Sequence, residues 1–371
     1  MPDTVDIAIL GATAAGYVAA ITCARNGRSV VLIDAPATPT ESPLCDWIPA
    51  DVVRESPVLK AVRSAGMDAA FRTVCFHSVD LAAQAVHSER ADAGYVLHAD
   101  RFLKALDALA GKAKVVRVRS EQPLLPSLQE SGVVFSGPRP VSAKLLLICQ
   151  GSPFEIITDL RLPVGNVPRG RLSVCGLDAP LPAGSVRNNL GKVLHVINYG
   201  AGERFGVFFA AGPTLHVRLI AAGTSAPTPA ELGELLSRLQ ANGLAPGKLG
   251  AVRMSGAFWR PPGGVALELE THLTKRTLLV GTAGGFVSAM TGQTLDPSVR
   301  SAMVAAAIAE KALKSRQPQD VLAAYKSQWR DKLADRIRPT GTSLQMLMPM
   351  VLANKAMTRR FARAFLYGEN F

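Results

Sequence analysis

The sequence has few residues of the kinds that build metal centres, disulfide frameworks or nucleic-acid platforms. Its 371 residues include five cysteines, with no Cys-x-x-Cys pair and no pairing pattern. This excludes a zinc ribbon and a disulfide scaffold, and it indicates a reducing compartment. The six histidines show no metal-ligand spacing, and we interpret His195 and His216 as satisfied histidines within strands. Since Gly-x-Ser-x-Gly is also absent, we expect neither a metal-dependent nor a hydrolytic enzyme.

Residues 5–24 are almost free of charge, but their surroundings argue against a targeting or membrane segment. Asp3 precedes this stretch and Asp6 lies within it, whereas the Lys or Arg residues that begin a signal peptide are absent. Gly11 would interrupt a spanning helix. We therefore expect a cytoplasmic protein without a signal peptide. With only 6% aromatic residues and no known nucleic-acid module, we also expect no nucleic-acid partner.

Residues 5–34 instead have the order strand, glycine turn, helix, strand and acid that builds a dinucleotide site. Gly11 and Gly16 suit a tight turn and close helix–strand packing, and a pyrophosphate would bind at the helix N-terminus. Asp34 stands where a carboxylate accepts the ribose hydroxyls. Thr13 occupies the position of the middle glycine, so the fingerprint is weakened and rests on its context.

The remaining pattern predicts an α/β fold with an inserted antiparallel sheet. The sequence predicts a buried strand at 144–149 and a late strand at 277–281. We expect both to join the parallel sheet of the first strands. Three strands follow one another between 193 and 221 with no helix between them, which is typical of an antiparallel sheet. We predict a discontinuous Rossmann-like nucleotide-binding domain at 1–155 and 265–315, a sheet domain at 156–264, and a basic helical region at 316–371.

Several motifs in order resemble one enzyme family. They are Gly11–Gly16 with Asp34, then 98–106, then 147–151, then the stretch Leu278–Gly292 with its Gly-Thr-Ala-Gly-Gly-Phe run. Together they resemble the FAD-dependent oxidoreductases with the p-hydroxybenzoate-hydroxylase fold, and most of all the geranylgeranyl reductase branch. The resemblance extends over most of the chain in order and spacing.

The resemblance implies FAD as cofactor and gives each motif a role. The pyrophosphate would lie on the first turn, the adenosine ribose on Asp34, the ribityl chain near Gly281, and the flavin N1/O2 edge at Gly292. The full set of implied cofactor residues is Gly11, Thr13, Ala14, Ala15, Gly16, Asp34, Arg101, Gly281, Thr282, Gly292 and Gln293. Thr282 and Gln150 replace aspartates of the family pattern. FAD with altered contacts and a non-catalytic role both stay open.

Residues of the reaction site follow from the same resemblance and from composition. Cys45 resembles in position the active-site cysteine of some reductases of this branch, although Asp46 and Trp47 replace glycines of that loop. The alternative for Cys45 is a buried, inert thiol. For the substrate pocket we name the aromatic residues of the inserted sheet, with core packing as the alternative: Phe205, Phe208, Phe209, Phe258 and Trp259.

These features predict an FAD-binding oxidoreductase that reduces double bonds of an isoprenoid or lipid-like apolar substrate, fed by an external electron donor. Thr13 and Gln150 replace a glycine and an aspartate of the family pattern, and these replacements argue against an NADPH-dependent hydroxylase. A flavin monooxygenase or halogenase is the alternative enzyme. The alternative of another class is a degenerate flavoprotein fold that serves as a lipid-binding or scaffold protein.

The C-terminal sixth of the chain carries most of the net positive charge of the protein. Residues 311–371 contain 12 Lys and Arg and 4 Asp and Glu, in a protein of net charge +12. Apolar positions at 347, 350, 351, 357, 361 and 365 have near-helical spacing, with Lys355, Arg359, Arg360 and Arg363 among them. Such a helix can lie on an anionic membrane surface, or it can pack on its own protein or a dimer partner.

Overall fold

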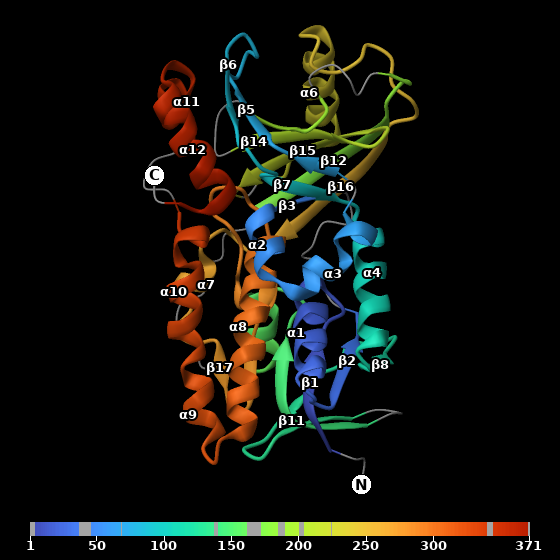
Figure 1. The fold of residues 1–371 in the computed structure, drawn as a ribbon, viewed down its shortest axis with the longest axis vertical. Helices are drawn as coiled ribbons and strands as arrows, with labels where there is room; N and C mark the ends of the chain where they lie inside the picture. Colours follow the sequence, from blue (N-terminus) through green and yellow to red (C-terminus); the bar gives the residue numbers. More distant parts are fainter. Residues whose placement is uncertain are drawn as a thin grey trace.

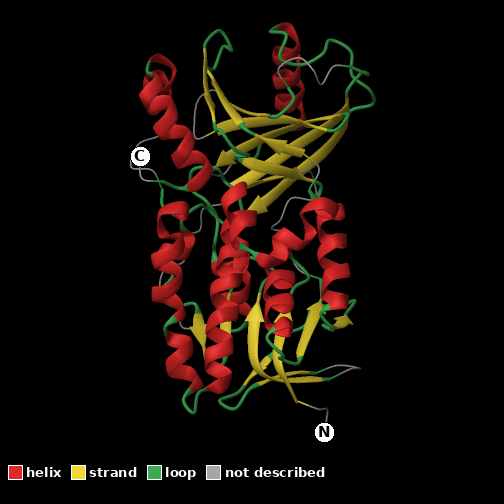
Figure 2. Cartoon of the chain, viewed as in Figure 1, coloured by secondary structure: helices red, strands yellow, loops and turns green. Residues whose placement is uncertain are grey.

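The computed structural model describes residues 4–36, 46–67, 69–136, 140–161, 172–184, 190–199, 204–223, 225–339 and 344–369. Two sheets lie one above the other along the long axis, and helices flank the lower one (Figures 1 and 2). The lower unit contains the N-terminal strands, and the upper unit contains the middle of the chain. The predicted α/β fold with an antiparallel sheet and a helical C-terminus is confirmed.

The lower sheet has the strand order β17-β18-β11-β1-β2-β8, with β10 and β9 continuing from β11. Its strands are β1 Thr4–Leu10, β2 Val30–Asp34, β8 Val116–Arg119, β9 Ser127–Leu128, β10 Val133–Phe135, β11 Val141–Ile148, β17 Leu273–Thr274 and β18 Thr277–Leu279. The central strand β1 runs parallel to β2 and β11. Its Ile7, Ala8 and Ile9 are fully buried, as expected for a strand covered on both faces.

Helices α1 (Ala14–Arg25) and α8 (Leu295–Lys314) pack against each other on one face of this sheet (Figure 1). Small residues make the contact close, because Ala15, Ala19, Ala302 and Ala305 are all at 0% exposure. The connection from β1 to α1 and the N-terminus of α8 therefore lie at the same edge of the sheet. This edge holds the carboxyl ends of the parallel strands.

The upper sheet has the order β16-β12-β15-β14-β13-β5-β6. Its strands are β5 Thr73–His77, β6 Gln84–Ser88, β12 Leu172–Pro180, β13 Val193–Asn198, β14 Arg204–Ala211, β15 Thr214–Ala222 and β16 Arg253–Arg260. The pairs are antiparallel except that β13 runs parallel to β5. Strands β5 and β6 come from residues 73–88, so this sheet also draws on a segment long before 156.

One face of the upper sheet is covered by α6 (Pro229–Ala241), which begins with a capping box between Thr228 and Glu231. Between the two units lie a small sheet and short helices: β3 Asp46–Pro49, β4 Ala69–Phe71, β7 Gly94–Leu97, α2 Ala50–Glu55 and α3 Pro57–Gly66. Helix α4 Ala99–Lys112 packs beside α1 in the lower unit (Figure 1). Three further short helical segments are described before α8: α5 Pro153–Asp159, α7 Val265–Glu268 and the 3₁₀ turn Gly281–Gly284.

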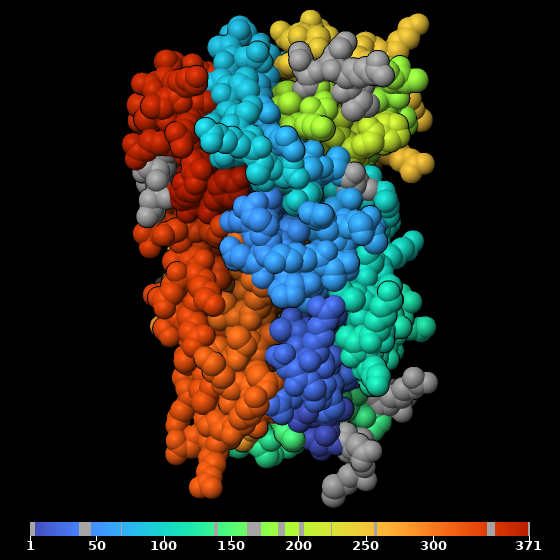
Figure 3. All heavy atoms as spheres, viewed as in Figure 1, coloured from blue at the N-terminus to red at the C-terminus, as the bar shows by residue number. Residues whose placement is uncertain are grey.

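The C-terminal helices run up the side of both units, as the red and orange atoms of Figure 3 show. They are α9 Pro318–Ala323, α10 Tyr325–Ile337, α11 Leu344–Ala353 and α12 Lys355–Tyr367. Helix α12 buries Phe361 and Phe365 against Phe76 and Trp47, with the Trp47 and Phe365 rings stacked at 5.7 Å. In the described residues no helix has both the length and the apolar character needed to cross a bilayer.

Candidate functional site

The turn between β1 and α1 makes its own internal contacts. Gly11 has φ +114°, and a Cβ at this position would lie 2.6 Å from the Cβ of Gln150. Thr13 is the N-cap of α1: its hydroxyl accepts a hydrogen bond from the Gly16 N–H at 3.2 Å and donates one to the Cys149 carbonyl at 2.9 Å. The threonine that replaces the middle glycine thus closes the helix start and ties it to β11.

The adenosine end of the expected cofactor site is accessible. Asp34 ends β2 with 52% of its side chain exposed, and Arg119 lies 3.9 Å from it. Arg101, in the first turn of α4, is also exposed. A cavity of about 270 Å³ opens at the carboxyl ends of β1 and β11, where Leu10 and Gln150 line it. Parallel sheets bind ligands at such a switch point, but neither Asp34 nor Arg101 lines this cavity.

At the ribityl position the backbone is covered by the protein itself. The Gly281 N–H donates to the Ser301 hydroxyl at 2.9 Å, and a Cβ at Gly281 would lie 3.1 Å from the Cβ of Ala15. Thr282 is 1% exposed. Ala15, expected beside the pyrophosphate, is fully buried, and its neighbour Ala14 is 1% exposed. A cofactor chain could pass here only if these groups separated.

The turn before α8 also uses its own backbone donors. The Gly292 N–H donates to the Ser288 carbonyl at 2.9 Å, and the Gln293 N–H donates to the Thr291 hydroxyl at 3.2 Å. These are the two N–H groups that the resemblance assigns to the flavin N1/O2 edge. The Gln293 side-chain amide donates to the Trp47 carbonyl, so strand β3 is joined to the turn.

The upper sheet packs directly on this turn. A Cβ at Gly292 would lie 2.7 Å from Leu172 Cδ2 and 3.1 Å from Ile220 Cγ2, and Arg260 Nη1 donates to the Gly292 carbonyl at 2.6 Å. The cavity left between sheet and turn measures about 20 Å³, with Phe209 on its wall. That is room for about one water molecule, whereas small-molecule sites usually enclose roughly 300–1,000 Å³.

Two buried arginines border the small cavity on the sheet side. Arg260 Nη2 lies 3.5 Å from the carboxylate of Asp46, and Arg218 Nη2 lies 2.9 Å from that of Asp178. Burial would raise the pKa of Asp178, but the hydrogen bond from His216 at 2.7 Å and the charge of Arg218 lower it below its ordinary value. The Nδ1 of His216 therefore has a hydrogen-bond partner, whereas its buried Nε2 has none among the described residues, so the histidine is satisfied only in part.

The expected cofactor site is exposed at its adenosine end and closed at its flavin end. Asp34 and Arg101 are exposed, but the described residues around Gly281, Gly292 and Gln293 leave no volume for an isoalloxazine ring. Their backbone donors are also engaged within the chain, although an anion site needs unpaired donors. In the described part of the chain, the cavity lined by Gln150 and the cavity lined by Gln293 have no residue in common.

The five aromatic residues predicted for the substrate pocket divide between the two faces of the upper sheet. Phe205, Phe209 and the partly exposed Phe258 belong to the face toward the lower unit. Phe208 is on the opposite face, within the core under α6. Trp259 alternates with Phe258 along β16 and is partly exposed. Cys45 lies outside the described residues.

A cluster that linear spacing did not reveal lies on the α6 face of the upper sheet. Cys75, His77 and His195 come together there from β5 and β13. Only the alternation Cys-x-His within a strand hinted at it, since two residues of that spacing share a face. His195 is far away in sequence, and only the pairing of β5 with β13 brings it near.

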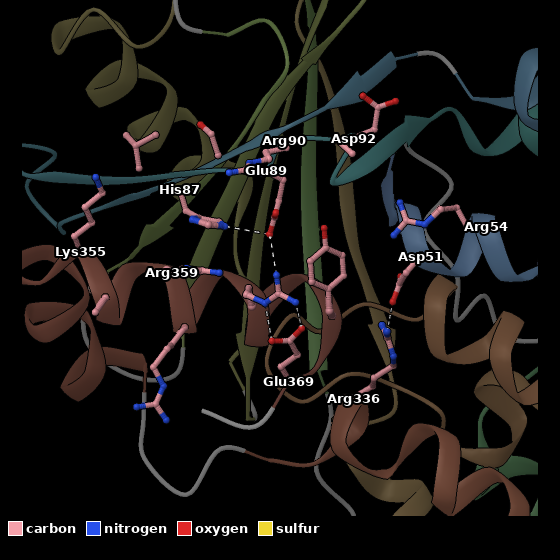
Figure 4. Close-up of a pocket in the computed structure, with 17 residues that line it drawn as sticks. Asp51, Arg54, His87, Glu89, Arg90, Asp92, Arg336, Lys355, Arg359 and Glu369 are labelled. Atoms are coloured by element: carbon pink, nitrogen blue, oxygen red, sulfur yellow. Dashed lines mark hydrogen bonds and ion pairs between the residues drawn. The ribbon is translucent and has the colours of Figure 1, made fainter.

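A basic groove of about 1690 Å³ lies between α12, β6 and α2 (Figure 4). Its cations are Arg54, Arg90, Arg336, Lys355, Arg359, Arg360 and Arg363, and its carboxylates are Asp51, Glu89, Asp92 and Glu369. Arg363 is paired with Glu369 and Glu89, and Arg336 with Asp51. Lys355, Arg359 and Arg360 are exposed along one side of α12.

Comparisons with solved structures place the fold. A geranylgeranyl bacteriochlorophyll reductase-like protein from Thermoplasma acidophilum matches with TM-score 0.74 and 17% identity, over 99% of this chain and 97% of that one. The p-nitrophenol 4-monooxygenase from Pseudomonas putida matches at 0.68 and 15%, over 99% and 94%. The flavin-dependent brominase Bmp2 matches at 0.67 and 13%, over 99% and 94%.

The chain therefore has the fold of flavin-dependent oxidoreductases, monooxygenases and halogenases. No protein-family model and no curated protein matches its sequence. Fold alone does not give function, since one fold serves many chemistries. The function must therefore be inferred from the residues of the site.

Proposed function

We propose that this protein is a non-catalytic binding protein built on the fold of the flavin-dependent oxidoreductases. The observation that carries the proposal is the cavity of about 20 Å³ between the upper sheet and the Gly292 turn, where the flavin ring of this fold would have to lie. Leu172 and Ile220 contact the turn directly, and Gln293 joins it to Trp47. These contacts leave no room for a flavin ring at the turn, and this supports a role without flavin chemistry.

The ligand class that the surface favours is an anionic phosphate-bearing membrane. The apolar side of α12 is used inside the protein, because Phe361 is 0% and Phe365 is 3% exposed. Only the cationic side of the helix, with Lys355, Arg359 and Arg360, is presented outward. Binding would therefore act through charge at the lipid headgroups, at about 1 kcal/mol for each cation near the surface, and not through insertion of an apolar face.

The first experiment is a flavin titration of the purified full-length protein. We expect no flavin absorbance as isolated and no quenching of FAD fluorescence on addition, because the ring has no space at Gly292. Asp34→Asn is the matched variant: it should change nothing if FAD does not bind, and it should weaken FAD binding if the adenosine end is used. One tightly bound FAD per chain, weakened by Asp34→Asn, would overturn the proposal.

The second experiment is co-sedimentation with phosphatidylserine-containing vesicles. Reversal of Lys355, Arg359 and Arg360 to Glu should reduce vesicle affinity at least about a hundredfold, from about 1 kcal/mol per cation removed. The control reverses three exposed lysines outside the groove: Lys60, Lys112 and Lys311. If both triple variants lost the same vesicle affinity, binding would depend on the net charge of the protein and not on the groove. A wild-type protein that ignores such vesicles at physiological salt would remove the membrane from the proposal.

A reductase of isoprenoid or lipid-like double bonds is the second candidate, with a monooxygenase or halogenase as its variant. It is favoured by the preserved Gly11–Gly16 turn and by the accessible Asp34 and Arg101. The upper sheet would first have to move off the Gly292 turn to admit a flavin, and an external donor would have to supply electrons. Binding of FAD in the titration, with reduction of the bound flavin by such a donor, would make this candidate the better one.

A further inference from the structure

Three side chains with metal-ligating atoms share one face of the upper sheet. Cys75 and His77 are two residues apart on β5 and so point to the same side. His195 stands opposite Cys75 on the parallel neighbour β13. All three are 1–3% exposed, and they lie near the edge strand β6.

The geometry of these groups is close to that of a coordination site. Cys75 Sγ and one ring nitrogen of each histidine all lie within 4.8 Å of one another. The Nε2 of His77 and the Nδ1 of His195 are 2.9 Å apart. The Oε1 of Gln84 is 3.6 Å from the sulfur, so a fourth oxygen donor is at hand.

The surroundings hold these side chains in position. The His195 ring is stacked on Phe208, with centroids 4.4 Å apart and an interplanar angle of 7°. Burial lowers the pKa of His77 to about 4 and raises that of the Cys75 thiol to about 12. Without a metal, the pocket therefore holds a neutral imidazole and a neutral thiol in an apolar layer.

We propose that Cys75, His77 and His195 bind one zinc or copper ion. One thiolate with two imidazoles suits both metals, and an amide oxygen or a water molecule would complete the shell. With Zn–N of about 2.0–2.1 Å and Zn–S of about 2.3 Å, tetrahedral ligand atoms stand roughly 3.3–3.6 Å apart. The two imidazole nitrogens would open slightly, and the sulfur would close toward them by side-chain rotation.

The protons balance in this step. The Cys75 thiol releases one proton to solvent as its sulfur bonds to the metal. One of the two histidines now donates the hydrogen bond between the rings, and its proton moves to its other ring nitrogen, so that both facing nitrogens bind as neutral imidazole. The metal would fix β5 and the edge strand β6 to β13, and it takes no part in the closed site at Gly292.

The test is a titration of the metal-free full-length protein with Co²⁺, as a spectroscopic substitute for Zn²⁺, and separately with Cu²⁺. We expect one ion per chain, with a thiolate charge-transfer band. Cys75→Ser should remove the band, whereas Cys175→Ser, at another buried cysteine of the same sheet, should keep it. His195→Gln should weaken binding more than about a hundredfold, because even the loss of an outer hydrogen-bond partner costs about 10–100-fold.

The two metals are separated by competition. A band displaced by Zn²⁺ supports the zinc form, and an intense visible band with Cu²⁺ that Zn²⁺ does not displace supports the copper form. Circular dichroism checks that each variant is folded. If Cys75→Ser does not fold, the metal affinity of His195→Gln tests the proposed site instead. Absence of stoichiometric binding to the wild-type protein, or equal loss in Cys75→Ser and Cys175→Ser, would leave the two histidines as a hydrogen-bonded pair and overturn the proposal.

Discussion

Replacement of Gly16 by valine is expected to leave no stably folded protein. A Cβ at this position would lie 1.9 Å from the carbonyl oxygen of Gly11 and 3.5 Å from Cγ2 of Ile9. The oxygen is a backbone atom of the central turn, so α1 would have to move off β1 before any side chain fits. We expect a loss of more than about 4 kcal/mol in the free energy of unfolding, measured by urea denaturation followed by circular dichroism.

Gly233→Ala in α6 is the matched control for this variant. A Cβ there meets nothing within 4 Å, and an alanine in a helix interior is favoured over glycine by about 0.5–1 kcal/mol. The control should therefore be slightly more stable than the wild type. A Gly16→Val protein within about 1 kcal/mol of the wild type would show that the helix can shift away from the strand at little cost, because the clash itself would exceed that amount.

The first strand, turn and helix could be predicted because their signals are local. The apolar run before Gly11, the glycines of the turn and the acid at Asp34 lie within one stretch of chain, and each residue type has one geometric reason to be there. The parallel sheet followed from the same logic, since buried strands at 144–149 and 277–281 have the same composition as the first. Structure and sequence agree where a pattern does not depend on a distant partner.

What could not be predicted depends on pairings between distant segments. The sequence offered no reason to place residues 73–88 in the upper sheet, because strand order is decided by the register of β5 with β13. The same pairing brings His77 to His195. The closure at Gly292 depends on Leu172, more than a hundred residues earlier, and motif spacing cannot report such a contact. Likewise the apolar spacing in α12 left membrane contact, packing on the protein and a dimer contact open, and it could not indicate that Phe76 and Trp47 pack against this helix.

Replacement of Arg300 by methionine is expected to destabilise the protein by about 3–5 kcal/mol, the cost of removing one partner from a buried ion pair, because Arg336 is then the remaining arginine that pairs with Asp51 and Asp296. Arg300 is 7% exposed in its side chain, with Nε 2.7 Å from Asp296 and Nη2 3.1 Å from Asp51. It also pairs with Glu55, and Arg336 shares the same two aspartates. Burial alone would lower the pKa of Arg300, but these carboxylates outweigh it and raise the pKa above its ordinary value.

The network joins α2, α8 and α10, and so it holds the strand β3 that closes the Gly292 turn. Arg338→Met is the control, because that arginine is 61% exposed and 3.9 Å from Asp335, a pair worth less than about 1 kcal/mol. Arg300→Lys should fall between the two, since an ammonium cannot reach several carboxylates as a planar guanidinium does. Urea denaturation could instead show the same small loss in the free energy of unfolding for Arg300→Met and Arg338→Met. In that case solvent would compensate the buried charges. The helices would then be held by apolar packing alone, and the closure of the flavin site would have to rest on Leu172, Ile220 and Trp47.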